Sequence, residues 1–360
     1  MVFSFADLSL KKRPLSMNYL QDVLQNETAR EEQLTAPRAI LVEELSQLRG
    51  RLLFLGVGGK MGPTLAVLAT RALRQAGSNL QILGISRFSN PASRDWLETH
   101  GVETLSADLL DPRAVASLPD AGWVISLAGR KFGTSEDPSE TWAVNCLLTS
   151  HICSRYSDSK IVALSTGNVY PMVSAGGEGS LENDPLVATG EYSAAAIGRE
   201  RILEYYSLHR GVNLAVVRLN YAVDLVYGVL VDIGKKVLAG EPIDLTMGYL
   251  NCIWQGDANE AILRLLSHTA CPRAAFNLTG PKLGVREIAL KFASHFNKEP
   301  HWANQEGPTA LLSNPKKIND LLGSPFTPID TVIRWTAQWL QGGGALLDRP
   351  TKFQAIDGKY

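Results

Sequence analysis

The sequence has few of the residues on which metal centres and disulfide frameworks depend. Its 360 residues include only four cysteines and six histidines. No HxxxH or HxH pair occurs, and the cysteines show neither the paired spacing of metal ligands nor a disulfide framework. We therefore expect no bound metal and four buried, reduced thiols, which are Cys146, Cys153, Cys252 and Cys271.

An excess of charge and long apolar runs are also missing. The 35 basic and 36 acidic residues are interleaved and leave a net charge of −1, which gives no electrostatic footprint for nucleic acid or an anionic membrane. No apolar run approaches the roughly 18 residues of a membrane-spanning helix, and the N-terminus lacks the order of a signal peptide. We expect a cytoplasmic protein, 45% hydrophobic and able to bury a sizeable core, that binds neither nucleic acid nor membrane.

A glycine-rich turn carries the strongest positive signal. Leu52–Leu55 fits a short buried strand, and Gly56, Gly59 and Gly62 follow at a three-residue spacing before a helical pattern over Thr64–Gln75. Glycines let the backbone approach a pyrophosphate, and the N-terminus of the next helix directs unpaired N–H groups at the anion. We predict dinucleotide binding here, in preference to a structural turn, with contacts from Gly56, Gly59, Lys60, Met61 and Gly62.

Short apolar runs alternate with longer helical patterns from this turn onward. This alternation predicts an α/β fold, in which a Rossmann-like, doubly wound parallel sheet is covered by helices on both faces. Its carboxyl strand ends would meet along one edge and form the ligand site there. The predicted strands are Leu52–Leu55, Gln81–Ser86, Glu103–Ser106, Trp123–Leu127, Ile161–Ser165 and Asn213–Leu219.

The chain is predicted to have four parts. A helical N-terminal extension (1–50) precedes the dinucleotide-binding domain (51–225), a smaller C-terminal α/β substrate domain (226–341, with help from the 171–190 loop) and a tail (342–360). Further helices are predicted over Asn18–Gln33, from Pro37 behind a Thr35 cap, and over Tyr227–Ala239, Asp257–Leu266, Val285–Phe296, Ala310–Leu322 and Ile329–Leu340, with a short strand at 276–280. The extension packs on the sheet or acts as a dimerisation arm, with packing favoured, and the tail is expected at the surface or between subunits.

Polar residues after the second and third strands predict the adenosine end of the site. Ser86 and Arg87 follow the second strand, where a carboxylate would select NAD. Because arginine pairs with phosphate in a fork geometry, NADP is favoured over NAD, although Arg87 is also explained as a solvated loop residue. Asp108, beside Leu109, offers a carboxylate to the adenine amino group, whereas Asp111 is explained as a helix cap.

The fourth strand is followed by small residues and then by two cations. Ala128 and Gly129 would let backbone approach the cofactor. Arg130 and Lys131 suit a substrate carboxylate or phosphate, although on a loop such residues are as often only solvated. We keep both interpretations of this pair open.

The order and spacing of these motifs resemble the extended short-chain dehydrogenase/reductase superfamily, and within it the NAD(P)-dependent epimerase/dehydratase family, over residues 52–296. The resemblance implies that Asn145 is a structural asparagine, that Thr166 and Tyr192 are the catalytic hydroxyl and acid/base, and that Tyr170 and Arg218 are motif residues. It rests on GVGGKMG, SADLLD, VISLAG, TWAVNCLLTSHI, IVALSTGNVYP, GEYSAAAIGRERI and VVRLNYA, which are similar to the family's glycine-loop, strand, YxxxK-helix and sixth-strand motifs.

The largest departure from the family pattern is the missing YxxxK lysine, because its place is taken by Ala196. In the family, that lysine binds the nicotinamide ribose and lowers the pKa of the tyrosine. Its charge would have to come from elsewhere. The candidates are Lys60, Arg130, Lys131 and Arg199, and a loop cation is favoured because Arg199 lies two helical turns, about 10 Å, beyond Tyr192.

Two further departures bear on the substrate. The places of the acid pair that eliminates water in the family's dehydratases hold Gly167 and Asn168, which disfavours dehydration. The stretch 248–257 lacks the arginine that binds a substrate diphosphate, so a small sugar or sugar acid is expected, and Asp257 is expected to be a helix cap. The predicted substrate contacts are Arg130, Lys131, Asn168, Tyr170, Asn220, Asn251 and Trp254.

The resemblance implies an enzyme that binds NADP or NAD and acts by reversible hydride transfer at a carbinol. The predicted function is a sugar or sugar-acid epimerase or oxidoreductase rather than a dehydratase, and a homodimer is consistent with it. The alternative is a non-catalytic NAD(P)-binding sensor or scaffold protein, which the loss of the lysine at position 196 supports.

Overall fold

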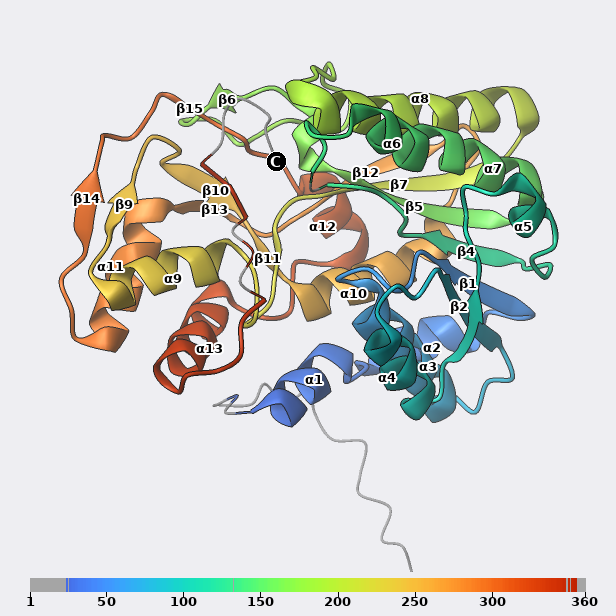
Figure 1. The fold of residues 1–360 in the computed structure, drawn as a ribbon, viewed down its shortest axis with the longest axis horizontal. Helices are drawn as coiled ribbons and strands as arrows, with labels where there is room; N and C mark the ends of the chain where they lie inside the picture. The colour runs from blue at the N-terminus through green and yellow to red at the C-terminus, as the bar shows by residue number, and fades with distance from the viewer. Residues whose placement is uncertain (1–23, 25, 132, 348, 350, 355–360) are drawn as a thin grey trace, which may run out of the picture.

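The protein is built around one seven-stranded parallel sheet, seen in a computed structural model that describes residues 24, 26–131, 133–347, 349 and 351–354 (Figure 1). The strand order is β12-β7-β5-β4-β1-β2-β3, and every neighbouring pair is parallel. This confirms the predicted Rossmann-like fold. The strands are β1 (Arg51–Leu55), β2 (Gln81–Ser86), β3 (Glu103–Ser106), β4 (Trp123–Ser126), β5 (Lys160–Thr166), β7 (Asn213–Leu219) and β12 (Ala274–Leu278).

Helices cover both faces of the sheet, as Figure 1 shows. Alternate residues of β1 enter different cores, because Leu52 and Phe54 pack on one face whereas Leu53 and Leu55 pack on the other. The first face carries α2 (Ala39–Ser46), α3 (Gly62–Gln75), α4 (Pro91–Thr99), α10 (Gln255–Arg264) and α12 (Lys316–Leu322), and the second carries α5 (Pro112–Ala116), α7 (Leu148–Arg155) and α8 (Gly190–Arg210).

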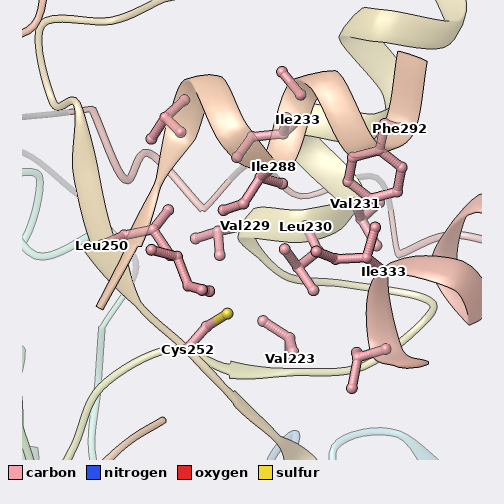
Figure 2. Packing of buried hydrophobic residues seen from close by; sticks show 14 of the residues in the cluster. Val223, Val229, Leu230, Val231, Ile233, Leu250, Cys252, Ile288, Phe292 and Ile333 are labelled. Atoms are coloured by element: carbon pink, nitrogen blue, oxygen red, sulfur yellow. The ribbon is translucent and has the colours of Figure 1, made fainter. Parts of the chain in front are cut away.

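A second, smaller lobe has its own apolar core. Figure 2 shows side chains from α9 and α11 meeting there, among them Leu230, Ile288 and Phe292, with Ile333 of α13 beside them. The lobe's helices are α9 (Val229–Ala239), α11 (Val285–Phe296) and α13 (Ile329–Gln341). Its strands form two-stranded pairs: β10 (Tyr249–Asn251) with β13 (Lys282–Gly284), β14 (His301–Ala303) with β9 (Pro242–Asp244), β11 (Ile253–Trp254) with β8 (Ala222–Val223), and β15 (Thr309–Ala310) with β6 (Val173–Ser174).

Two short helical segments depart from the α-helical pattern near the carboxyl edge of the sheet. Between α6 (Pro138–Trp142) and α7, residues Ala143–Leu147 form a π-helical turn that contains Asn145. After β5, Gly167–Val169 form a single 3-10 turn. Another 3-10 segment, Leu265–His268, directly follows α10. Insertions of this kind redirect side chains, and they recur at functional sites.

Several local predictions near the ends of the chain are wrong or only partly tested. The helix expected over Asn18–Gln33 is described only in α1 (Glu27–Thr35), capped by Asn26, because residues 18–23 and 25 lie outside the described residues. Thr35 ends α1 and donates to the Glu31 carbonyl, so it caps nothing, and α2 begins two residues beyond Pro37. The extension packs against α3 and α10, on the outside of the sheet.

Predictions beyond the sixth strand also need correction. Asp257 lies inside α10 and accepts from the amide and hydroxyl of Thr327, so it is no cap. Residues 309–310 form β15, and the predicted helix Ala310–Leu322 begins only at Lys316 because the chain first runs along β6. The strand near residues 276–280 is β12, which joins the main sheet beside β7, so the segment assigned to the second domain returns to the first.

The cysteine prediction is correct only in part. All four thiols are free. Cys153 and Cys252 are buried, and burial raises the pKa of each to about 12. Cys271, however, is exposed and Cys146 is half-buried.

The glycine loop depends on a close backbone contact at the centre of the sheet. Gly56 ends β1 with a φ of +84°, and a Cβ there would lie 2.8 Å from the amide nitrogen of Ala128, beyond the end of β4. At Gly62 a Cβ would lie 2.1 Å from the Val57 carbonyl oxygen. The first contact holds the loop against the sheet, and the second packs the start of α3 on the loop. The loop lies where the strand order reverses, which is where doubly wound sheets bind ligands.

A glycine replacement tests this close contact. We expect Gly56→Ala to lower the free energy of unfolding by about 1 kcal/mol for the left-handed φ and about 1–3 kcal/mol more for the clash. Gly77→Ala is the matched control, because Gly77 also has a positive φ (+60°) but nothing within 4 Å of a Cβ. The two variants are compared by urea denaturation, and equal losses would contradict the inferred contact with Ala128.

Candidate functional site

Two cavities lie along the carboxyl edge of the sheet. One, of about 500 Å³, is lined by the glycine loop and by the residues that follow β2, β3 and β4, and we call it the glycine-loop cavity. The other, of about 300 Å³, lies beyond the ends of β5 and β7 beside Tyr192, and we call it the Tyr192 cavity. Arg349 lines both, so the cavities adjoin at this residue.

The glycine-loop cavity brings together most of the residues predicted to bind a dinucleotide. Asp108 is held in place because its Oδ1 accepts from the Leu110 amide at 3.0 Å, and Asp111 caps α5 as predicted. A Cβ on Gly58 would lie 2.8 Å from the Ser86 hydroxyl, so the loop and the end of β2 fit only without a side chain there. The predicted residues in the lining are Gly56, Gly59, Ser86, Arg87, Asp108, Leu109, Ala128 and Gly129.

The Tyr192 cavity holds the two hydroxyls of the predicted catalytic pair. Thr166 ends β5, and Tyr192 lies in the first turn of α8. Asn168 joins the two elements, because its amide donates to the Thr166 hydroxyl at 3.2 Å and its carbonyl accepts from Ser193 on α8. Asn220 also lines this cavity, as does Met61, which was predicted to touch the cofactor from the glycine loop. A hydroxyl or carbonyl entering the cavity would therefore meet both oxygens.

Three cations line the Tyr192 cavity, and none of its described lining residues is acidic. Lys60 donates to the Ala222 carbonyl at 2.8 Å and lies over the Tyr227 ring. Although Lys60 is exposed to solvent, protein around its ammonium group desolvates it and, against the opposing effect of Asp224, lowers its pKa to about 8. Desolvation likewise lowers the pKa of Lys131 to about 8, against the opposing effect of Asp232. Together with Arg349 they make this cavity attractive to an anion.

Three residues predicted to bind substrate lie elsewhere. Tyr170 is buried, donates to Asn277 at 2.8 Å and accepts from Arg218 at 2.6 Å, and burial raises its pKa to about 12. Asn251 accepts from the Ser313 amide and donates to the Gly280 carbonyl. Trp254 is buried against Trp335 in the core of the second lobe. Their polarity or aromatic surface suggested a pocket, but each is used in packing or in a buried hydrogen bond.

Some predicted residues lie beside the cavities rather than in their linings. Arg130 forms an ion pair with Glu140. Asn145 lies on the π-helical turn, where its Nδ2 donates to the carbonyls of Arg130 at 3.2 Å and Thr141 at 2.8 Å, as suits a structural asparagine. Gly62 packs on Val57 at the start of α3. Of the predicted cation pair, only Lys131 reaches the Tyr192 cavity.

Sequence reasoning missed several residues of the Tyr192 cavity. Tyr221 lies in the VVRLNYA motif and Tyr227 begins the helix predicted over Tyr227–Ala239, but neither was predicted to line a site. Arg349 and Thr351 come from the tail, and Thr351 is held by its amide and hydroxyl to Asp232 of α9. A tail that was expected only at the surface or between subunits thus completes the cavity. The arginine among its residues was the one available signal.

The described residues contain no group of three His, Cys, Asp or Glu side chains that could hold a metal ion. None of the helices in the described ranges is long and apolar enough to cross a membrane.

The comparisons with known proteins bear on the family and the fold. Residues 53–227 match the model of the NAD dependent epimerase/dehydratase family. This part of the chain belongs to the NAD-dependent epimerase/dehydratase family. The match confirms the resemblance predicted from the glycine loop, the Thr166 segment and the Tyr192 helix.

Solved structures of similar fold include three sugar-nucleotide enzymes. UDP-glucose 4-epimerase from Thermus thermophilus, complexed with NAD, is 22% identical to this chain, with a TM-score of 0.64 over 81% of this chain and 99% of the other. UDP-glucuronic acid 4-epimerase from Bacillus cereus is 17% identical, with a TM-score of 0.65 over 81% of this chain and 99% of that enzyme. dTDP-glucose 4,6-dehydratase from Bacillus anthracis is 16% identical, with a TM-score of 0.65 over 81% of this chain and 97% of that enzyme. At these identities the similarity establishes the fold. No curated protein matches the sequence.

Proposed function

We propose that this protein is an NAD(P)-dependent oxidoreductase or epimerase that acts on a secondary hydroxyl of a small, anionic sugar. The observation that carries the proposal is the Tyr192 cavity, where Thr166 and Tyr192 lie in one wall with Lys60, Lys131 and Arg349 around them. The adjoining glycine-loop cavity supports a dinucleotide beside them. A polar reacting group in such a cavity, close to a phosphate-binding loop, is the arrangement that hydride-transfer chemistry requires.

The residues of the glycine-loop cavity fit a dinucleotide. Side chains are excluded at Gly56 and Gly58, so bare backbone faces the space beside the N-terminus of α3. Asp108 and Ser86 lie where the adenosine would bind. A bound NAD(P) would supply the hydride acceptor and donor.

The chain's own residues would handle the proton. Thr166 would hydrogen-bond the substrate oxygen and orient it toward Tyr192, whose phenol would accept the proton of a carbinol during oxidation and return it during reduction. Epimerisation requires the ketone to be reduced from its other face, whereas an oxidoreductase releases it. The places of a dehydratase acid pair hold Gly167 and Asn168, so loss of water is disfavoured.

The cavity favours a small anion over a nucleotide sugar. Its volume of about 300 Å³ is at the lower end of the range of about 300–1,000 Å³ that is usual for ligand pockets. The three cations in the described lining suit a carboxylate or phosphate on the sugar. A sugar acid or sugar phosphate meets both conditions.

A second candidate function is binding of NAD(P) without turnover, as a sensor or scaffold. Ala196 supports it, because this side chain is buried against Val169 and Tyr170, and no lysine is available at the family position. Retention of Thr166 and Tyr192 together in one cavity favours the enzyme.

Activity is tested by screening free sugars, sugar acids, sugar phosphates and nucleotide sugars with NAD and NADP, following nicotinamide absorbance and product stereochemistry. We expect Tyr192→Phe to lower kcat at least about 100-fold, because the proton carrier is lost, while cofactor affinity stays nearly intact. Tyr205→Phe, an exposed change on the same helix, is the control. A wild-type protein that binds cofactor but turns over no substrate would support the binding function instead.

The lowered pKa values of Lys60 and Lys131 predict a pH dependence of anion binding. Both are charged below about pH 8 and lose the charge above it, so glucuronate binding should weaken as the pH rises past 8. The double variant Lys60→Arg/Lys131→Arg should keep its affinity to higher pH, because arginine stays charged. Calorimetric titration between pH 7 and about pH 9 measures both. Parallel curves for the two proteins would refute a role for these lysines.

The cofactor preference rests on Arg87. We expect Arg87→Asp to weaken NADP binding about 10-fold to 100-fold, as expected for loss of a charge-assisted hydrogen bond to the 2′-phosphate, and NAD binding far less. Arg113→Asp is the control, because Arg113 is exposed and lies outside the described lining of the glycine-loop cavity. Dissociation constants from fluorescence titration decide the matter, and equal losses for the two cofactors would show the NADP preference to be wrong.

A further inference from the structure

The helix that carries Tyr192 also carries a cation, Arg199, on the same face. At 3.6 residues per turn, Tyr192, Ala196 and Arg199 project from α8 within about 60° of one another. Side chains of a helix lean toward its N-terminus, so Arg199 reaches back over the turn that contains Ala196. The side chain of Ala196 is a single methyl group, so it does not itself extend over that turn.

Arg199 is a buried cation without a carboxylate partner. Only 6% of its surface is exposed, and no ion pair to it occurs in the part of the chain that the structure describes. Its one side-chain hydrogen bond runs from Nη1 to the Ala128 carbonyl at 3.3 Å, and its Nε has no partner. A buried charge is costly unless it is paired, so this one requires a reason.

The neighbouring acid does not neutralise it. Glu200 lies next to Arg199 in the chain, but its carboxylate accepts hydrogen bonds from Arg218 at 2.7 Å and from the Ser165 hydroxyl at 2.6 Å. These hydrogen bonds overcome the effect of burial and hold the pKa of Glu200 below its usual value. The charge of Arg199 is therefore left to act on its other surroundings.

The contacts of the Arg199 guanidinium are at the end of β4, and Tyr192 lies on the same face of α8. A Cβ on Gly129 would lie 2.7 Å from Arg199 Nη1 and 3.3 Å from Asn145 Oδ1, which is buried and also without a partner. Ala128 and Gly129 line the glycine-loop cavity, so the guanidinium lies directly behind cofactor-facing backbone. Burial lowers the pKa of Arg199, whereas interaction with the Tyr192 phenolate, and with Glu200 and Cys146, raises it.

We propose that Arg199 is the positioning residue that replaces the missing family lysine, holding the end of β4 and supplying the positive charge that favours ionisation of Tyr192. This inference rests on the proposed function. It differs from the expectation that a loop cation is more suitable, because the reach of arginine toward the N-terminus of α8 offsets the seven-residue separation.

Other charged or titratable groups face Tyr192 and need to be separated from Arg199. Lys60, Lys131 and Arg349 line the same cavity, and Tyr227 interacts with Tyr192 electrostatically. On the other side, Glu200 and Cys146 are near Arg199. The test therefore needs a cavity-cation control as well as changes at position 199.

The ionisation of Tyr192 can be measured without cofactor or substrate. An ultraviolet pH titration of the full chain is compared with that of Tyr192→Phe, so that the difference isolates this phenol. The same pair is measured in the Arg199→Gln background, where an N–H donor remains but the charge is gone. We expect the midpoint to move up by about 1 pH unit or more, the usual effect of losing a nearby opposite charge.

Three further variants complete the experiment. Arg199→Lys should keep the midpoint near that of the wild type, Ala196→Lys should return the midpoint of Arg199→Gln toward it, and Lys131→Gln should move it less than Arg199→Gln does. Thermal unfolding confirms that each variant folds. An unchanged midpoint in folded Arg199→Gln, or a larger shift in Lys131→Gln, would overturn the proposal.

This result is distinguishable from failure of the proposed function. If no sugar is turned over, the hydride-transfer proposal fails, yet the titration of the unliganded protein still reports whether Arg199 acts on Tyr192. Where turnover is found, the pH–rate profile of Arg199→Gln should shift upward in the same direction, with recovery in Arg199→Lys.

Discussion

The buried ion pair between Arg218 and Glu200 fixes the site to the sheet. Arg218 lies on β7, between β5 and the edge strand β12, and its guanidinium binds the Glu200 carboxylate of α8 at 2.7 Å. The same guanidinium donates to the Tyr170 hydroxyl and to the Glu182 carbonyl, and Tyr170 continues to Asn277 on β12. One cation thereby joins α8, two strands and the 171–190 loop, so the helix that carries Tyr192 cannot shift without breaking it.

Such a network is better understood as a means of positioning than as a source of stability. The desolvation of two ions offsets most of their attraction, whereas removal of one partner leaves a buried charge and costs about 3–5 kcal/mol. Because Ser165 precedes Thr166 and donates to Glu200, the same carboxylate also fixes the end of β5. Thr166 and Tyr192 are therefore both held by neighbours of one ion pair, although they come from distant parts of the sequence.

The fold could be predicted from the sequence because its signals are local. Each strand is a short apolar run followed by a polar or glycine-rich end. The glycine loop indicates where the strand order of the sheet reverses. Part of the lining of the glycine-loop cavity was predictable for the same reason, since the predicted contacts lie at or soon after the end of a strand. The Tyr192 cavity was only half predictable. Arg349 and Thr351 reach it from a tail whose path depends on contacts with α9, and no local pattern encodes such a contact.

The side chains of Tyr170, Asn251 and Trp254 suit a ligand, but Tyr170 and Asn251 are used in hydrogen bonds inside the protein and Trp254 packs against Trp335. Arg199 was given less weight than a loop cation because helical spacing places its Cα far along α8, and that count ignores the direction in which its side chain leans. Polarity alone therefore cannot separate a binding residue from a buried one.

Arg218 on β7 and Arg199 on α8 are two kinds of buried cation. Arg218 is neutralised by Glu200 of α8 and contributes rigidity, whereas Arg199 forms no ion pair with a carboxylate in the described residues. A lysine added at position 196 would place another ammonium group beside that guanidinium, and the two like charges would repel each other in a medium of low dielectric constant. If Arg199 carries the charge, alanine at position 196 is the residue that the electrostatics require, and its presence is then no sign of a lost activity.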